Sequence, residues 1–200
     1  MELQRLREIQ KMDDSQKMNI IDNYGEYNLD RHDIRKIAGT IKNKDFMEKL
    51  IHNYQDYTLN NDDVVDLLLG SHDDDLRKEV LNDYQKYDID DIDALDIARG
   101  IGDNEFKKEL FYDISNDKNR YGIDNDPSNL ALLALSVDDN EFRQEVVDNA
   151  EKYNFGETDV FRLNFEIRNS KDKQQSNSEL NKMLDNSEER NVNDGKSRTI

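Results

Sequence analysis

Residues 84–113 read YQKYDIDDIDALDIARGIGDNEFKKELFYD, and the thirty residues before them, 54–83, read YQDYTLNNDDVVDLLLGSHDDDLRKEVLND. The two stretches place tyrosine and large apolar residues at the same positions, and the same register reaches back to residue 24. The recurring positions are Tyr24, Tyr54 and Tyr84; Tyr27, Tyr57 and Tyr87; Leu29, Leu59 and Ile89; Ile37, Leu67 and Ile97; Phe46, Leu76 and Phe106; and Leu50, Val80 and Leu110. A fixed period of this size indicates a small structural unit that stacks on copies of itself.

Each unit is expected to form two short helices. In residues 84–113, the run from Asp91 to Ala98 begins with acidic residues, which the helix macrodipole favours in a first turn. Gly100 ends this run, and Asp103 is a suitable N-cap for a second helix that continues through Ile114. The apolar residues of the second run are spaced as one helical face.

The other units are expected to follow the same plan. The sequence predicts helices from Asn61 to Gly70 and from Asp73 to Tyr84, and a helix from about Asp14 to Tyr27 in the leading unit. Eight Gly and one Pro give the chain few turn formers for a strand-rich fold. We therefore predict an all-α fold, an αα-solenoid of about five helix-pair repeats with a roughly thirty-residue period.

The fourth unit is irregular, because Phe142 follows its counterpart Phe106 by thirty-six residues rather than thirty. The additional residues fall at 116–127, in a segment that is either an insertion for binding or tolerated drift. A last helix through Val160 and Ile167 is expected to close the array. Beyond it the chain turns polar, so we predict a helical repeat domain over 1–169 and a disordered tail over 170–200.

The composition restricts the function classes. The net charge is −18, and the repeat body carries the whole excess, because residues 1–20 and 170–200 each sum to zero. Such a charge repels nucleic acid and anionic membranes and attracts basic protein surfaces, although acidic residues also simply solvate helices. The absence of Cys, of a signal-peptide pattern and of a long apolar run leads us to expect a cytoplasmic chain with no membrane segment.

The sequence resembles the ankyrin repeat most clearly in the third unit. The run from Ala94 to Ala98 resembles the ankyrin first helix, with Leu95, Ile97 and Ala98 at its packing positions, although Asp96 stands where ankyrin places a buried His. Gly102, Glu105 and Phe106 resemble the opening of its second helix. The resemblance implies a degenerate ankyrin-like array over roughly 31–168, with Gly102 at the turn between helices. No Thr-Pro pair opens a first helix, and the unit is about three residues shorter than in ankyrin. The projecting hairpin and its contacts are therefore not carried over.

The recurring tyrosines are expected in the core between units rather than in an exposed aromatic ladder. Partner-binding residues should instead occupy positions that change from unit to unit, or the irregular segment. One such position holds His32, Asp62 and Ile92, and another holds Lys36, Asp66 and Asp96. The candidate partner-binding residues are His32, Lys36, Asp62, Asp66, Asp96, Asp117, Arg120 and Tyr121.

Catalysis and metal binding have little support. The three histidines occupy different positions of the repeat, and no phosphate loop, nucleophile elbow or zinc helix motif is present. The acidic run from Asp88 lacks the Gly and Glu of a calcium loop. His72 with the three following aspartates is explained by helix capping and solvation. We expect no enzyme activity, no cofactor and no metal.

The expected function is that of a protein–protein interaction adaptor whose partner has a basic surface, without direct nucleic-acid binding. The alternative is an acidic nucleic-acid mimic that blocks a basic cleft of a DNA- or RNA-binding protein. An adaptor requires exposed apolar residues among the charges, whereas a mimic requires rows of carboxylates. Degenerate ankyrin-like arrays are frequent in intracellular bacteria and viruses, so a secreted effector acting in a host cytosol is one hypothesis for its setting.

Overall fold

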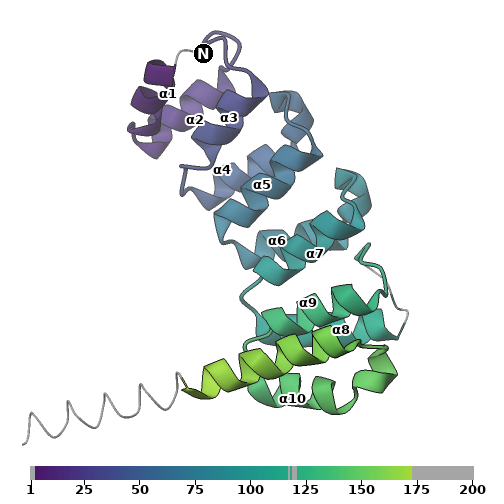
Figure 1. The fold of residues 1–200 in the computed structure, drawn as a ribbon. Helices are drawn as coiled ribbons and strands as arrows, with labels where there is room; N and C mark the ends of the chain where they lie inside the picture. Colours follow the sequence, from purple (N-terminus) through teal and green to yellow (C-terminus); the bar gives the residue numbers. More distant parts are fainter. Residues whose placement is uncertain (1–2, 117, 119–120, 173–200) are drawn as a thin grey trace, which may run out of the picture. The chain divides into compact units, whose positions relative to one another are not determined.

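Helices make up all of the regular structure in the computed structural model, which describes residues 3–116, 118 and 121–172 (Figure 1). The predicted all-α class is confirmed for this part of the chain. The α-helices are α1 (Leu3–Gln10), α2 (Asp14–Asp22), α3 (Arg31–Ala38), α4 (Lys44–His52), α5 (Asn61–Ser71), α6 (Asp74–Asn82), α7 (Asp91–Gly100), α8 (Asn104–Ser115), α9 (Pro127–Ser136), α10 (Asn140–Asp148) and a helix over 157–172.

Two compact units divide the chain, the first over Met1–Val137 and the second over Asp138–Ile200. The last helix continues past the predicted domain boundary at residue 169. The predicted disordered tail over 170–200 lies outside the described residues from 173 onward.

Capping aspartates and asparagines fix the helix starts at regular intervals. The side chains of Asp13, Asn43, Asp73, Asp103 and Asp139 each accept a hydrogen bond from a backbone amide in the first turn of α2, α4, α6, α8 and α10. Asp30, Asn60, Asp90 and Asp126 cap α3, α5, α7 and α9 in the same way. Since these caps satisfy amides that have no partner within the helix, Asp or Asn recurs at the start of every α-helix from α2 to α10.

Within the first compact unit, each odd-numbered helix packs on the next. The contacts run from α1 to α3, α3 to α5, α5 to α7 and α7 to α9, and each even-numbered helix from α2 to α8 contacts the odd-numbered helix that follows it. Ile34, Val64 and Ala94, at thirty-residue spacing, are all fully buried. The recurring apolar positions therefore form a core that continues from one helix pair to the next.

The recurring tyrosines lie after the second helix of each pair, which corrects the predicted helices through Tyr27 and Tyr84. α2 ends at Asp22 and α6 at Asn82, and Tyr54–Tyr57, Tyr84–Tyr87 and Ala150–Tyr153 form single 3₁₀ turns. At the ends of α2 and α4, the side chain of an asparagine C-cap bonds to a carbonyl of the last turn. The Asn53 side chain, for example, donates to the Lys49 carbonyl at 2.8 Å.

The recurring tyrosines are only in part core residues, since Tyr54, Tyr57 and Tyr87 are buried and Tyr24, Tyr27 and Tyr84 are partly exposed. The ring centroids of Tyr24 and Tyr57 are 6.4 Å apart, and those of Tyr54 and Tyr87 are 6.1 Å apart. The Tyr57 hydroxyl donates to Asp22 Oδ1 at 2.7 Å. Each ring thus adds apolar area to the joint between units, while its oxygen reaches a polar partner near the surface.

A left-handed residue follows each of these turns. Asn28, Thr58, Asp88 and Asn154 have φ between 51° and 60°. Asn and Asp tolerate this conformation well, whereas a β-branched residue such as Thr58 does so only with strain. The left-handed residue turns the chain toward the next first helix, and no described residue forms a strand or a β-hairpin at this point.

The irregular segment 116–127 contributes to the core. Tyr121 and Ile123 are buried, and the Tyr121 ring meets the Phe106 ring edge-on with centroids 5.9 Å apart. Gly122 has φ of +74°, and a Cβ placed there would lie 2.6 Å from the Tyr84 ring. Only glycine fits both the backbone conformation and the close approach.

Buried basic residues tie consecutive helix pairs together. Lys17, Arg77 and Lys107 are each at most 5% exposed and lie in the second helices α2, α6 and α8. Arg77 donates to the Leu68 and Leu69 carbonyls at 3.0 and 2.9 Å and to the Gly100 carbonyl. Lys17 donates to the Thr40 carbonyl and Lys107 to the Ser136 carbonyl. Each base therefore binds the carboxyl end of the following first helix, where the macrodipole favours positive charge.

Candidate protein-interaction surface

Five of the predicted partner-binding residues lie on the first helices. His32 and Lys36 are exposed on α3, Asp62 and Asp66 are exposed on α5, and Asp96 is partly exposed on α7. Their exposure follows from the helical period, because the intervening positions such as Ile34 face the core.

The remaining predicted residues lie in the irregular segment. Asp117 and Arg120 are outside the described residues. Tyr121 is 5% exposed and packs against Phe106. Tyr121 is therefore a core residue in this structure and offers little surface to a partner, because an aromatic ring next to a loop can anchor that loop as readily as it can bind.

The charges on α3 and α5 are largely paired with each other. Arg35 Nε lies 3.4 Å from Asp63 Oδ1, and a second guanidinium nitrogen of Arg35 pairs with Asp66. Asp63 is buried and also accepts the backbone amide of Asn60. This network joins α3 to α5, so Asp66 has a structural partner within the chain.

The acidic residues around α7 are in a different situation. Burial and the negative charges of Asp90, Asp62 and Asp96 raise the pKa of Asp93 above its ordinary value, and burial is the larger cause. Asp96 pairs with Arg99 at 2.9 Å, on the same helix. We define the acidic patch as Asp62, Asp90, Asp93 and Asp96, which is a gathering of like charges that costs the fold stability.

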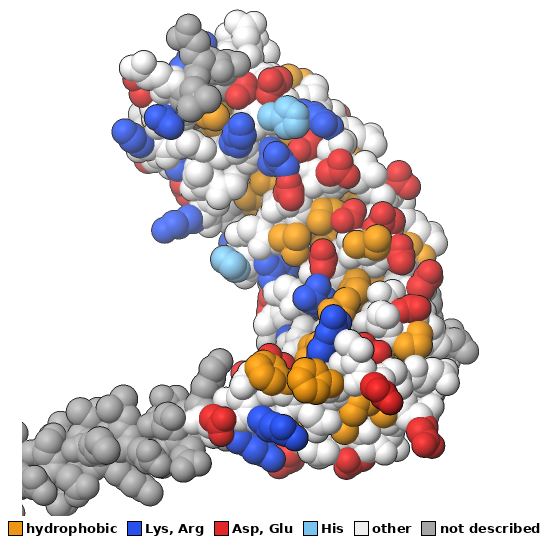
Figure 2. All heavy atoms as spheres, viewed as in Figure 1, with side chains coloured by type: hydrophobic (Ala, Val, Ile, Leu, Met, Phe, Trp, Pro, Cys, Tyr) orange, Lys and Arg blue, Asp and Glu red, His pale blue; other side chains and the backbone are white. Residues whose placement is uncertain are grey.

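An exposed isoleucine accompanies the acidic patch. Ile92 is 66% exposed, whereas its neighbour Ala94 is fully buried. Figure 2 shows acidic and hydrophobic side chains together over α5 and α7, while lysine and arginine side chains gather over α1 to α3. Sequence comparison of the units singles out position 92 as variable. Asp93 could not be found in that way, because it occupies the capping-box position of Asp33 and Asp63.

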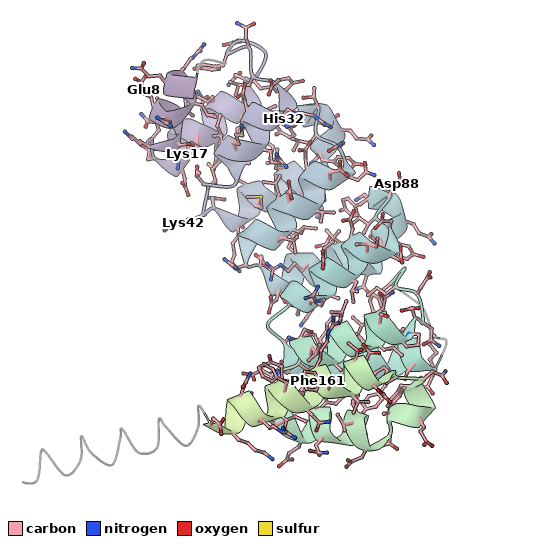
Figure 3. All side chains as sticks on the ribbon, in the orientation of Figure 1. Glu8, Lys17, His32, Lys42, Asp88 and Phe161 are labelled. Carbon is pink, nitrogen blue, oxygen red and sulfur yellow. The ribbon has the colours of Figure 1, made fainter. Side chains whose placement is uncertain are left out.

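A second exposed apolar feature lies in the second compact unit. Phe161 and Phe165, one turn apart on the helix over 157–172, are 68% and 52% exposed. Their rings stack with centroids 6.4 Å apart, and Phe161 lies on the solvent-exposed side of its helix (Figure 3). Leu163 and Ile167, on the opposite face, are buried.

One group of side chains among the described residues has a spacing suited to a divalent cation. Glu48 and His52 on α4 and Glu79 on α6 bring one potential ligand atom each within 4.8 Å of one another. His52 Nε2 lies 2.9 Å from Glu79 Oε1. Two aspartates after His72 make structural hydrogen bonds. Asp73 caps α6 by accepting the Leu76 amide at 3.3 Å, and Asp74 accepts the Gly102 amide, in the loop between α7 and α8, at 2.8 Å.

Among the described residues, no helix combines the length and the apolar character that crossing a membrane requires. Comparison of the chain with protein-family models, curated proteins and solved structures finds no match.

Proposed function

We propose that this chain is a protein–protein interaction module that binds a basic partner surface through the acidic patch. In this proposal the chain is an αα-solenoid of about five helix-pair repeats, a degenerate relative of ankyrin-like arrays. It works in a cytoplasm, either its own cell's or that of a host. The observation that carries the proposal is that the partly buried carboxyl of Asp93 has a pKa raised by burial and by the charges of other aspartates. Next to it in the chain is Ile92, which is 66% exposed.

A basic partner would relieve the repulsion that the free chain tolerates. A Lys or Arg brought to the acidic patch would neutralise the like charges, and contact with Ile92 would remove apolar area from water. Protein–protein interfaces usually have an apolar core surrounded by a rim of polar and charged residues. The free energy lost by gathering acids in the unbound chain would thus be recovered on binding.

The distribution of the acids supports an adaptor over an acidic nucleic-acid mimic. Many aspartates are committed to helix starts as N-caps, including Asp73, Asp103 and Asp139. Mimicry requires carboxylates free to form rows at phosphate-like spacing. The exposed Ile92, Phe161 and Phe165 are of no use for mimicry, but they fit an interface with a protein.

The test compares affinity capture by the full chain and by three variants, followed by titration of the captured protein in purified form. Asp93→Asn and Ile92→Asp should each weaken the complex at least ten-fold, since Asp93 belongs to the acidic patch and Ile92 is the exposed apolar residue next to it. The double variant Glu26→Gln/Glu141→Gln, which removes exposed acids elsewhere, should leave affinity unchanged.

The salt response separates the two functions. We expect binding of the captured protein to weaken only a few-fold between 0.05 and 0.5 M salt, roughly, because an apolar contact is not screened. A complex that collapses over this range and is insensitive to Ile92→Asp would overturn the adaptor in favour of the mimic.

A further inference from the structure

A cavity of about 410 Å³ lies between the loop joining α3 to α4 and the loop joining α5 to α6. Its walls include Gly39, Thr40, Met47, Gly70, Ser71 and Asp73. All of these residues belong to the first compact unit. The carboxyl ends of two first helices, α3 and α5, therefore meet at one hollow.

The cavity lies at the unit that lacks the buried basic residue of its neighbours. Met47 stands thirty residues after Lys17 and thirty before Arg77, at the position where a buried base binds carbonyls in the neighbouring units. Arg77 binds the carbonyls of Leu69 and Gly100. Gly39 and Gly70 stand thirty residues before these two, and both glycines line the cavity. Methionine is buried here as well, but its thioether has no hydrogen to donate to a carbonyl.

Two equivalent glycines show that the space is open at one unit and filled at the next. A Cβ placed on Gly100 would lie 3.5 Å from two atoms of the Arg77 guanidinium group. A Cβ placed on Gly70, thirty residues earlier, would meet no atom within 4 Å. The hollow at Gly70 thus occupies the place that the Arg77 guanidinium takes at Gly100.

We propose that this cavity binds the side chain of an arginine that a partner protein supplies. The carboxyl ends of α3 and α5 offer carbonyl acceptors and the negative end of two helix dipoles to a guanidinium group. The Met47 side chain offers an apolar wall for the aliphatic stem. Arginine is favoured over lysine because the planar fork of Arg77 reaches three carbonyls in the equivalent place, whereas the Lys17 ammonium donates to the Thr40 carbonyl alone.

Lys44 governs how well the cavity accepts a cation. Lys44 and Asp74 are at equivalent positions, thirty residues apart. The Asp74 carboxylate lies 3.5 Å from the Arg77 guanidinium, so the unit with the cavity has a base where the next unit has an acid beside its buried arginine. Lys44 Nζ is 3.0 Å from Asp73 Oδ2, and this hydrogen bond raises the pKa of the Lys44 ammonium. Lys42 also lines the cavity, but it extends away from the helices (Figure 3). A bound guanidinium would compete with Lys44 for Asp73.

The probe is N-acetyl-arginine amide, added to the full chain and followed by amide NMR of Gly70 and Ser71. Its matched control is N-acetyl-citrulline amide, which has nearly the same shape and no charge. We expect a saturable shift of both amides with the arginine compound and a shift at least five-fold smaller with citrulline. Lys44→Asp, which restores the acid of the neighbouring unit, should tighten binding of the arginine compound several-fold.

Filling the cavity from within is the complementary test. Met47→Arg should move the Gly70 amide toward its probe-bound position, raise the melting temperature and abolish the response to the arginine compound. The proposal is overturned if citrulline acts as strongly as arginine, if Lys44→Asp does not respond to arginine, or if Met47→Arg retains the response.

The inference rests on the proposed function for the source of the arginine, since a partner protein must supply it. The two can fail separately. A cavity that ignores the probe leaves binding through the acidic patch intact. If instead the cavity binds the probe, and the captured partner binds the Asp93→Asn and Ile92→Asp variants as well as it binds the wild type, only the role of the acidic patch is overturned.

Discussion

Arg77 donates a hydrogen bond to the carbonyl of Gly100, twenty-three residues further along the chain. Arg77 is 3% exposed, and its guanidinium group lies between the carboxyl ends of α5 and α7. Lys17 stands in the same relationship to Thr40. The buried charge is tolerated because backbone carbonyls accept its hydrogen bonds. The same hydrogen bonds also hold the following helix pair in place.

Replacing Arg77 by methionine should destabilise the first compact unit by about 3 kcal/mol. The substitution leaves the carbonyls of Leu68, Leu69 and Gly100 without their charged donor, and bonds to charged groups are stronger than neutral ones. Urea unfolding of the full chain, followed by circular dichroism, measures the change. Lys86→Met, at an exposed position, serves as the control. A loss under about 0.5 kcal/mol would show that the base contributes little net stability.

Gly122→Ala should cost about 2 kcal/mol or more, because it combines a left-handed backbone with a contact of 2.6 Å to the Tyr84 ring. The two causes can be separated in a double-mutant cycle. In a Tyr84→Ala background the steric part disappears, so Gly122→Ala should then cost about 1 kcal/mol. Equal costs in both backgrounds would mean that the ring does not constrain the glycine.

Thr58→Asn should stabilise the chain by about 0.5–1 kcal/mol, since Asn tolerates a φ of 60° better than a β-branched residue. The other units already carry Asn28, Asp88 and Asn154 at this position. The reverse change, Asn28→Thr, should destabilise by a similar amount. Thermal melts of both variants check the pair, and a gain from Asn28→Thr would contradict the argument.

Asp93→Asn should stabilise the chain at pH 7, and the gain should vanish in acid. The pKa of Asp93 is raised in the folded state, so its ionised form penalises folding above the unfolded pKa of about 3.9. Below that value the carboxyl is protonated in both states, and the penalty is gone. Urea unfolding at a series of pH values from 7 down to 3 measures this trend.

Asp103→Asn provides a control of opposite sign. The hydrogen bond from Lys78 lowers the pKa of Asp103, so its ionised form stabilises folding above the unfolded pKa, and this contribution is lost as pH falls through the folded pKa. Asparagine still caps the helix, so only the charge changes. Asp103→Asn should therefore destabilise at pH 7 and approach the wild type in acid. A stability change of the same sign in both variants at pH 7 would contradict one of the two assignments.

The sequence was sufficient to predict several helix starts, but not all of the helix ends. α7 begins at Asp91 as predicted, because a capping aspartate and an acidic first turn are local signals. The end of α6 was predicted at Tyr84 but falls at Asn82. Two tyrosines three residues apart satisfy an α-helical face and a 3₁₀ turn equally well, so spacing alone does not separate these structures.

The candidate surface was predictable in part. Variation between units correctly places Asp62 and Ile92 on the exposed side of their helices, because constant positions are those that pack. The pKa of Asp93 is raised by burial first and then by the charges of Asp90 and Asp62, and both its burial and its proximity to Asp62 are tertiary relationships. The buried bases do leave a signal in the sequence, since Lys17, Arg77 and Lys107 keep the thirty-residue register. Met47 interrupts that signal at the second unit.

The tyrosine turn and the left-handed residue after it have a consequence for how the number of thirty-residue units could change. Throughout the described residues, units are joined without a strand, so a chain cut at Asn28, Thr58 or Asp88 would expose no unpaired β-edge to neighbouring molecules. Its terminal units would need only a polar outer face to stay dispersed. Duplication or loss of thirty residues at these points would therefore change the length of the protein without creating a template for aggregation.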